Sequence, residues 1–147
     1  MSDTLSQLEE LAQRRLETNE PGPEQELLGA LSQITDTAQL RGLAERFYAD
    51  PEVSVPTFER ILQLCPGDVT ARVQFGFVYF LMGEDEAAVR QLEEARTLDP
   101  EHLQVLTLEA ALSGDPAEKI RLYRRILQKD PRNEVALGKL RELDVSQ

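Results

Sequence analysis

Residues 75–83 read FGFVYFLMG, and this stretch holds four of the chain's eight aromatic residues, which are five Phe and three Tyr. None of its nine positions carries a charge, whereas a surface helix needs only one apolar face. With about 100° between successive residues of a helix, the stretch divides into two sides. The residues expected on the core side are Phe75, Val78, Tyr79 and Met82. The residues expected on the opposite side are Val73, Phe77, Phe80 and Leu81. The stretch therefore predicts a helix with a second apolar face.

The composition narrows the class of protein. The chain has 147 residues and a formal net charge of −11, which suits one domain with a buried core. The excess of acids argues against nucleic-acid binding, because that binding needs Lys and Arg to neutralise phosphates. No apolar run could cross a bilayer, and residues 1–15 lack the pattern of a secretory signal. With one cysteine, Cys65, and hence no internal disulfide, we expect a cytoplasmic protein without membrane insertion.

Apolar residues recur at three- and four-residue spacing, which predicts helices throughout. The first helix carries Leu5, Leu8, Ala12 and Leu16, before a break at EPGP, residues 20–23. The second carries Leu27, Leu28, Leu31 and Ile34. The third is capped within TDT, residues 35–37, and carries Leu40, Leu43, Ala44 and Phe47. The fourth carries Phe58, Ile61, Leu62 and Leu64. We expect it to begin near Ser54, because a proline such as Pro56 is tolerated only in a first turn.

Prolines mark a repeat in the sequence. Pro66 in LCPGD and Pro100 in LDPEH are 34 residues apart (100 − 66), and Pro131 in KDPRN follows 31 residues later (131 − 100). The separation of 34 also relates four further pairs, which are Gly42 and Gly76, Phe58 and Leu92, Ile61 and Ala95, and Leu64 and Leu98. Each period is long enough for two helices.

On these residues the sequence resembles the tetratricopeptide repeats. In segment 69–102 the positions that match the signature of that family are Phe75, Gly76, Tyr79, Ala88, Leu92 and Pro100. Arg72 stands where the family has Trp. Segment 35–68 keeps Gly42 and Pro66, although we expect Pro56 to shorten its second helix. Segment 103–131 keeps Pro131 but has a first helix about three residues shorter.

The resemblance implies an all-α fold, namely a right-handed superhelix of antiparallel helix pairs with about nine helices. A single domain would span residues 1–147, with about three repeats over 35–131 and a capping helix over 132–143. Residues 1–34 would form N-terminal helices or a degenerate repeat. Gly76 and Ala88 are expected where two helices approach closely, with Tyr79 and Leu92 filling the space between them.

The resemblance also directs the first helix of each pair toward a concave surface, which makes Val73, Phe77, Phe80 and Leu81 the expected floor of a binding groove. Some family members hold acidic chaperone tails with Lys and Asn at such positions, where this chain has Val73 and Phe77. We therefore expect an apolar peptide or helix as the partner and interpret the chain as a non-enzymatic adaptor, scaffold or chaperone-like module. Two alternatives remain: a neighbouring helix covers these residues, or the protein self-associates and fills the groove with its own chain or another copy.

A basic stripe offers a second candidate surface. Arg121, Arg125 and Lys129 recur every fourth residue, with Arg124 and Arg132 beside them. One interpretation is a solvated outer face whose cations favour the C-terminal end of the helix. The other is docking of an acidic partner, including the acidic N-terminal half of a second copy, which would give a homo-oligomer.

Candidates for chemistry are few. His102 follows Pro100 where a helix begins, so we expect a surface or capping role. Cys65 is expected to be half-buried at a helix end. We find no metal-ligand spacing, phosphate-binding loop or nucleophile motif. We therefore expect no catalytic residues, no metal and no cofactor, and an enzyme ranks third among the functions considered, after the interaction module and the self-associating protein.

Overall fold

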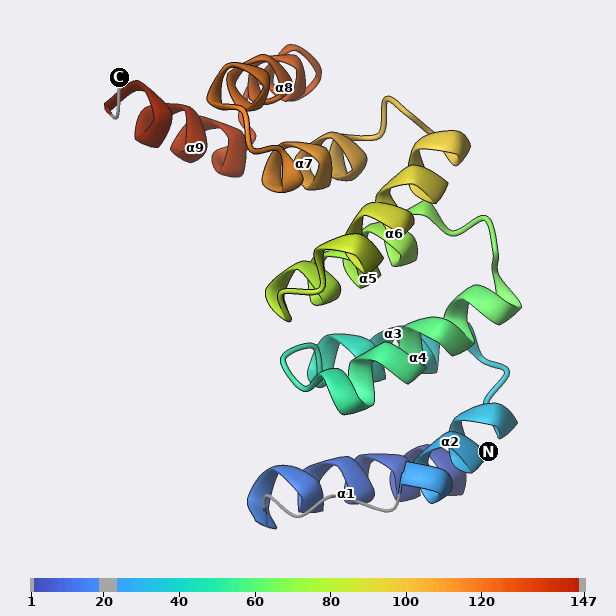
Figure 1. Ribbon diagram of the computed structural model, residues 1–147. Coiled ribbons are helices and arrows are strands. Elements are labelled where there is room, and N and C mark those ends of the chain that lie inside the picture. The colour runs from blue at the N-terminus through green and yellow to red at the C-terminus, as the bar shows by residue number, and fades with distance from the viewer. Residues whose placement is uncertain (1, 19–23, 146–147) are drawn as a thin grey trace. The chain divides into compact units, whose positions relative to one another are not determined.

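The computed structural model describes residues 2–18 and 24–145, which form helices joined by short connections (Figure 1). The helices of this described part are α1 (Ser2–Thr18), α2 (Glu24–Gln33), α3 (Thr37–Arg46), α4 (Pro51–Leu64), α5 (Val69–Leu81), α6 (Asp85–Leu98), α7 (Leu103–Leu112), α8 (Pro116–Lys129) and α9 (Glu134–Val145). No strand occurs among the same residues. The predicted all-α fold is confirmed. The break expected at residues 20–23 lies outside the described residues, and so does the side chain of Leu16.

The chain divides into two compact units, Met1–Ala71 and Arg72–Gln147. In the first unit α1 packs against α2, α3 packs against α4, and α2 also contacts α4. The expected core face of α3 is buried and consists of Leu40, Leu43, Ala44 and Phe47. Asp36 caps α3 by accepting a hydrogen bond from the backbone N–H of Ala38 at 2.9 Å. The handedness with which successive pairs stack stays a prediction.

One turn is built three times along the chain. After α4, α6 and α8, a backbone N–H donates to the carbonyl four residues earlier, which joins Cys65 to Ile61, Asp99 to Ala95 and Asp130 to Ile126. The residues that follow these donors are Pro66, Pro100 and Pro131. A side chain then caps the next helix in each case, from Asp68, His102 and Asn133. Because proline cannot continue a helix, the three prolines end the helix pairs as predicted.

In the second unit, Gly76 lies where α5 is closely approached by two other helices. A Cβ atom at Gly76 would lie 2.6 Å from Cδ2 of Leu108 on α7. It would also lie 3.5 Å from Cβ of Gln91 and 3.6 Å from the carbonyl oxygen of Ala88, both on α6. A side chain at position 76 would require the end of the Leu108 side chain to move, so the expected close approach at Gly76 and the buried Ala88 is confirmed.

Polar and aromatic contacts complete the α5–α6 pair. Arg72 forms an ion pair with Glu94 and donates a hydrogen bond to Gln91 at 3.4 Å. The ring of Tyr79 lies against that of Phe75, with centroids 4.6 Å apart. An ion pair between α5 and α6 therefore stands at the position where the resemblance leads to Trp.

The last pair is shorter at its first helix. Helix α7 has 10 residues and α5 has 13, a difference of three that the spacing from Pro100 to Pro131 predicts. Helices α7, α8 and α9 share one buried cluster, which consists of Leu106, Ala110, Leu122, Tyr123, Ile126 and Ala136. Leu140 and Leu143 of α9 pack against this cluster. Burial raises the pKa of the Tyr123 phenol above its ordinary value.

Helix α4 departs from the prediction. It begins at Pro51, and the Asp50 side chain accepts a hydrogen bond from the N–H of Glu52 at 3.3 Å, so the expected start near Ser54 is wrong. Pro56 lies inside the helix and does not shorten it, because α4, α6 and α8 each have 14 residues. The helix lacks only the one bond that an N–H of residue 56 would donate near its start. Ser54 is fully buried at the position that Ala88 takes 34 residues later (88 − 54).

Gly42 also departs from its expected role as a residue that defines the repeat. A Cβ atom added to Gly42 would meet nothing within 4 Å, whereas the equivalent Gly76 is crowded. The reason is that α3 buries Leu40, Leu43 and Ala44 and turns Gly42 to solvent. The 34-residue register therefore aligns the two glycines without giving them the same surroundings.

The two glycines allow a paired test of the packing at α5. We expect Gly76→Leu to lower the free energy of unfolding by about 1–3 kcal/mol, because the new side chain would overpack against Leu108. We expect Gly42→Ala to raise it by about 0.5–1 kcal/mol, because that helical position is open and alanine restricts the unfolded chain. Chemical denaturation measures both changes. Equal stability of Gly76→Leu and the unaltered chain would contradict the close approach of α7.

Candidate functional site

The C-terminal end of α5 presents an apolar surface. Phe77 and Phe80 are half-buried, Leu81 is 71% exposed, and Met82, just after the helix, is 43% exposed. Residues three and four apart lie on one side of a helix, so Phe77, Phe80 and Leu81 are neighbours there. We call Phe77, Phe80, Leu81 and Met82 the α5 surface. The structure leaves it partly open to solvent.

The solvent exposure of two residues, Val73 and Met82, differs from the prediction. Val73 is only 1% exposed, so the expectation that it lies on an open surface is wrong. Ala71 and Phe75 are buried on the other side of the helix, so α5 is enclosed on two sides near its beginning. Met82 was expected in the core but is exposed, because α5 ends at Leu81 and helical spacing no longer sets its direction. Of the other three expected core residues, Phe75 and Val78 are buried and Tyr79 is half-buried.

A glycine turn fixes the end of α5 and thereby orients this surface. Gly83 has φ of 79°, in the left-handed region that glycine enters without strain. Its N–H donates to the carbonyl of Phe80 at 3.1 Å, and the N–H of Glu84 donates to the carbonyl of Tyr79 at 2.9 Å. This pair of bonds is the Schellman arrangement that closes helices. Leu81 and Met82 are thus held at a defined position.

Acidic side chains border the α5 surface, a feature that helical periodicity does not indicate. Glu84, Asp85 and Glu86 follow Gly83 directly and are all exposed. Asp85 and Glu86 occupy the first turn of α6, where negative charge favours the helix dipole, as expected. Glu84 is the N-cap residue, but its side chain makes no capping hydrogen bond. The signal in the sequence is that residues 73–89 contain three acids and no Lys or Arg.

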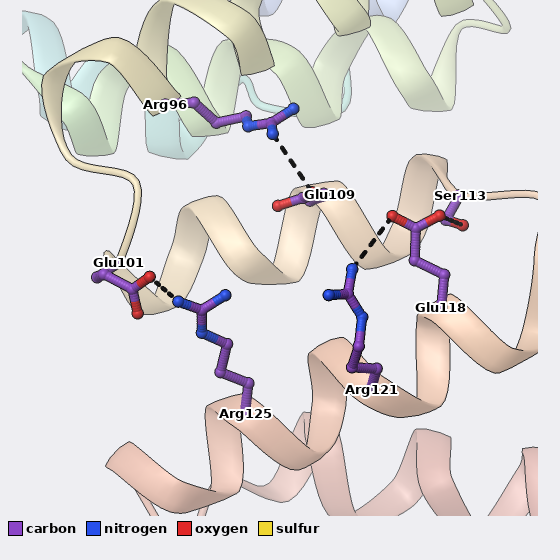
Figure 2. A network of polar contacts seen from close by, with 7 residues as sticks. All are labelled: Arg96, Glu101, Glu109, Ser113, Glu118, Arg121 and Arg125. Atoms are coloured by element: carbon purple, nitrogen blue, oxygen red, sulfur yellow. Dashed lines mark hydrogen bonds and ion pairs between the residues drawn. The ribbon is translucent and has the colours of Figure 1, made fainter.

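The residues of the basic stripe are engaged in ion pairs within the chain. Arg125 pairs with Glu101, at the α6–α7 connection, and Lys129 pairs with the same carboxylate at 3.4 Å. Arg121 lies 3.7 Å from Glu118. Figure 2 shows the Arg121 and Arg125 side chains reaching from α8 toward these acids. Arg125 and Lys129 therefore connect α8 to the segment just before α7, whereas the Arg121 pair lies within α8. The role of the stripe in docking stays a prediction.

The same network extends to both ends of α7 (Figure 2). Arg96 of α6 lies 3.8 Å from Glu109 of α7. The Ser113 hydroxyl, at the C-terminal end of α7, donates to Glu118 at 3.1 Å. A shallow hollow of about 380 Å³ on α8 is lined by Ala117, Ile120, Arg121, Arg124, Arg125 and Gln128. This face combines cations with a small apolar centre.

The two residues singled out for chemistry have structural positions. The His102 imidazole caps α7, since its Nδ1 accepts a hydrogen bond from the N–H of Gln104 at 3.2 Å. Cys65 is half-buried at the C-terminal end of α4. Both placements match the expectation. Among the described residues no group of three or more His, Cys, Asp or Glu could hold a metal ion. None of the helices in that part of the chain could span a membrane.

Comparison with known proteins gives structural relatives. No protein-family model matches the chain, and no curated protein is significantly similar in sequence. The first tetratricopeptide domain of Spaghetti (RPAP3), bound to the HSP90 peptide SRMEEVD, is similar with a TM-score of 0.65 and 15% identity, over 75% of this chain and 94% of that one. The thermophilic tetratricopeptide protein TTC0263 of Thermus thermophilus gives 0.64 and 18%, over 94% and 80%. The MamA protein gives 0.61 and 14%, over 97% and 82%.

The ion pairs of Glu101 lead to a prediction about stability. We expect Glu101→Gln to lower the free energy of unfolding by about 1 kcal/mol or less at low salt, because its partners Arg125 and Lys129 are partly exposed. The difference should vanish at high salt, which screens exposed charges. Denaturation at two salt concentrations measures it, with Glu93→Gln as the control, because Glu93 is exposed and lies in the middle of α6. A large loss in the free energy of unfolding that does not depend on salt would contradict the assignment of these ion pairs to the protein surface.

Proposed function

Because the chain has the tetratricopeptide-repeat fold, we propose that it is a non-catalytic protein-interaction module whose contact site is the α5 surface. The observation that carries this proposal is the exposure of Leu81 and Met82 beside two half-buried aromatic rings. Single exposed apolar residues are ordinary on protein surfaces, whereas a group of them next to aromatic side chains is typical of an interaction site. The module would act as an adaptor or scaffold.

The packing of α5 supports this assignment. Its core contacts are made by Phe75, Gly76 and Val78, which are all buried. Leu81 is not needed for that core, because most of its side chain remains in water. An apolar side chain that stays exposed gains free energy only when a partner covers it, at about 25 cal/mol for each Å² of apolar area removed from water. The exposed side chains of the α5 surface therefore contribute more to the binding of a partner than to the stability of the fold.

The chemistry of the surface favours an apolar partner over an acidic one. The Spaghetti domain is bound to SRMEEVD, a peptide with three acidic residues. Acidic peptides are held through Lys or Arg, and residues 73–89 of this chain have neither. Side chains such as Leu, Met or Phe in a partner would instead cover Phe80 and Leu81. We propose that these apolar contacts supply most of the binding energy.

The substitution Leu81→Ser tests the site. Peptides would first be selected on the unaltered chain from a random display library, and their affinity measured by fluorescence anisotropy. We expect Leu81→Ser to weaken the selected peptides about tenfold or more, as loss of a central apolar anchor does. Its free energy of unfolding should change by about 0.5 kcal/mol or less, because the side chain is exposed.

The matched control is Val135→Ser on α9, another exposed aliphatic residue, at 54%. This variant should bind the selected peptides as the unaltered chain does. Two results would contradict the proposal: the library yields no peptide, or the peptides bind Leu81→Ser and Val135→Ser with equal affinity.

A further inference from the structure

We propose that the partner of the α5 surface is a cationic amphipathic helix. Its apolar side chains would lie on Phe77, Phe80 and Leu81, and its Lys or Arg side chains would face Glu84, Asp85 and Glu86. This inference rests on the proposed function, because it names the chemistry of the partner that the same surface takes.

The charges around the surface are of one sign. Between Arg72 and Arg90 the chain has three acids and no cation. The Arg72 side chain is directed to α6, where it pairs with Glu94 and bonds Gln91. Arg90 is exposed one helical turn after Glu86, and the structure forms no ion pair between them. A cationic segment would therefore meet complementary charge beside its apolar contact, and an acidic one would be repelled.

The carboxylates beside the surface have no ionic partner within the described part of the chain. Several other acids of the second unit are paired, such as Glu94 with Arg72, Glu101 with Arg125 and Glu109 with Arg96. Glu84, Asp85 and Glu86 form no such pair there, and the Glu84 side chain does not serve as a cap. The net charge of −11 adds a long-range attraction for a cationic partner. These three carboxylates are thus available to a cationic ligand that lies on the α5 surface.

The shape of the apolar contact favours a helix over an extended segment. Phe77, Phe80 and Leu81 form a short stripe along about 6 Å of one helix, since each residue adds about 1.5 Å. Backbone groups inside α5 are already hydrogen-bonded and offer no edge to which an extended peptide could pair. A helix satisfies its own backbone and needs only side-chain contacts. Anchors three and four residues apart on the partner match this stripe.

Two synthetic peptides test the inference. They share one apolar helix face of Leu and Met, and one carries Lys on its polar face where the other carries Glu. Fluorescence anisotropy with the unaltered chain should give an affinity about tenfold higher for the Lys peptide at low salt, a size expected for a few exposed charge pairs. The preference should shrink at high salt. The triple variant Glu84→Gln, Asp85→Asn, Glu86→Gln should lose the preference but still bind through apolar contacts.

The control variant carries the same change in net charge on α9, with Glu134→Gln, Glu142→Gln and Asp144→Asn. This control variant should still bind the Lys peptide more tightly than the Glu peptide. That result would show that the preference comes from the acids beside the α5 surface and not from the net charge of the protein. Equal affinity for both peptides, or tighter binding of the Glu peptide, would overturn the inference and leave the proposed function standing. Loss of the preference in the α9 control would overturn it as well. If neither peptide binds, the proposed function fails together with it.

Discussion

The close approach of α7 to α5 at Gly76 is the contact on which the second unit depends. A Cβ atom at this position would lie 2.6 Å from the end of the Leu108 side chain, so the absence of a side chain lets Leu108 of α7 pack directly against α5. This contact joins the α5–α6 pair to α7, and α7 in turn shares its cluster with α8 and α9. Helix pairs of this type cannot bury their apolar faces alone, so the contact between pairs completes the core.

The same packing leaves one end of α5 uncovered. Near Val73 the helix is enclosed on two sides, but toward Leu81 only one side is buried. The glycine turn at Gly83 then ends the helix and brings Glu84 and Asp85 next to the apolar side chains. An apolar surface with an acidic border follows from the order of residues in a single helix and turn. The cations of α8 are arranged differently, because Arg125 and Lys129 already share Glu101.

Much of this architecture could be predicted from residues whose effect is local. Proline ends a helix wherever it follows the C-cap, so Pro66, Pro100 and Pro131 locate the turns. The loss of three residues between the last two prolines shortens α7 by the same amount. Capping by Asp36 and His102 follows from side chains that reach their own backbone. These features need no knowledge of which helices become neighbours.

The features that could not be predicted from the sequence depend on contacts with residues that are distant along the chain. Gly42 and Gly76 hold equivalent positions in the 34-residue register, but only Gly76 has close neighbours. The crowding comes from the helices that pack against α5, and the register does not specify them. Val73 lies on the predicted second face and is nevertheless buried. Pro56 lies inside α4 and not in its first turn, because Asp50 and Pro51 start the helix earlier than expected. At the candidate site, periodicity could identify Phe77, Phe80 and Leu81 but not the exposure of Met82, which lies beyond the helix end.

The central claim is that α5 is enclosed near its beginning and open to solvent at its C-terminal end in the free protein. Hydroxyl-radical footprinting with mass spectrometry measures side-chain exposure directly and needs no partner. We expect Leu81 and Met82 to be modified rapidly in dilute solution, and Val73 and Val78 to be protected. Protection of Leu81 and Met82 at every protein concentration would contradict the account, because it would mean that the chain itself covers the surface assigned to a partner.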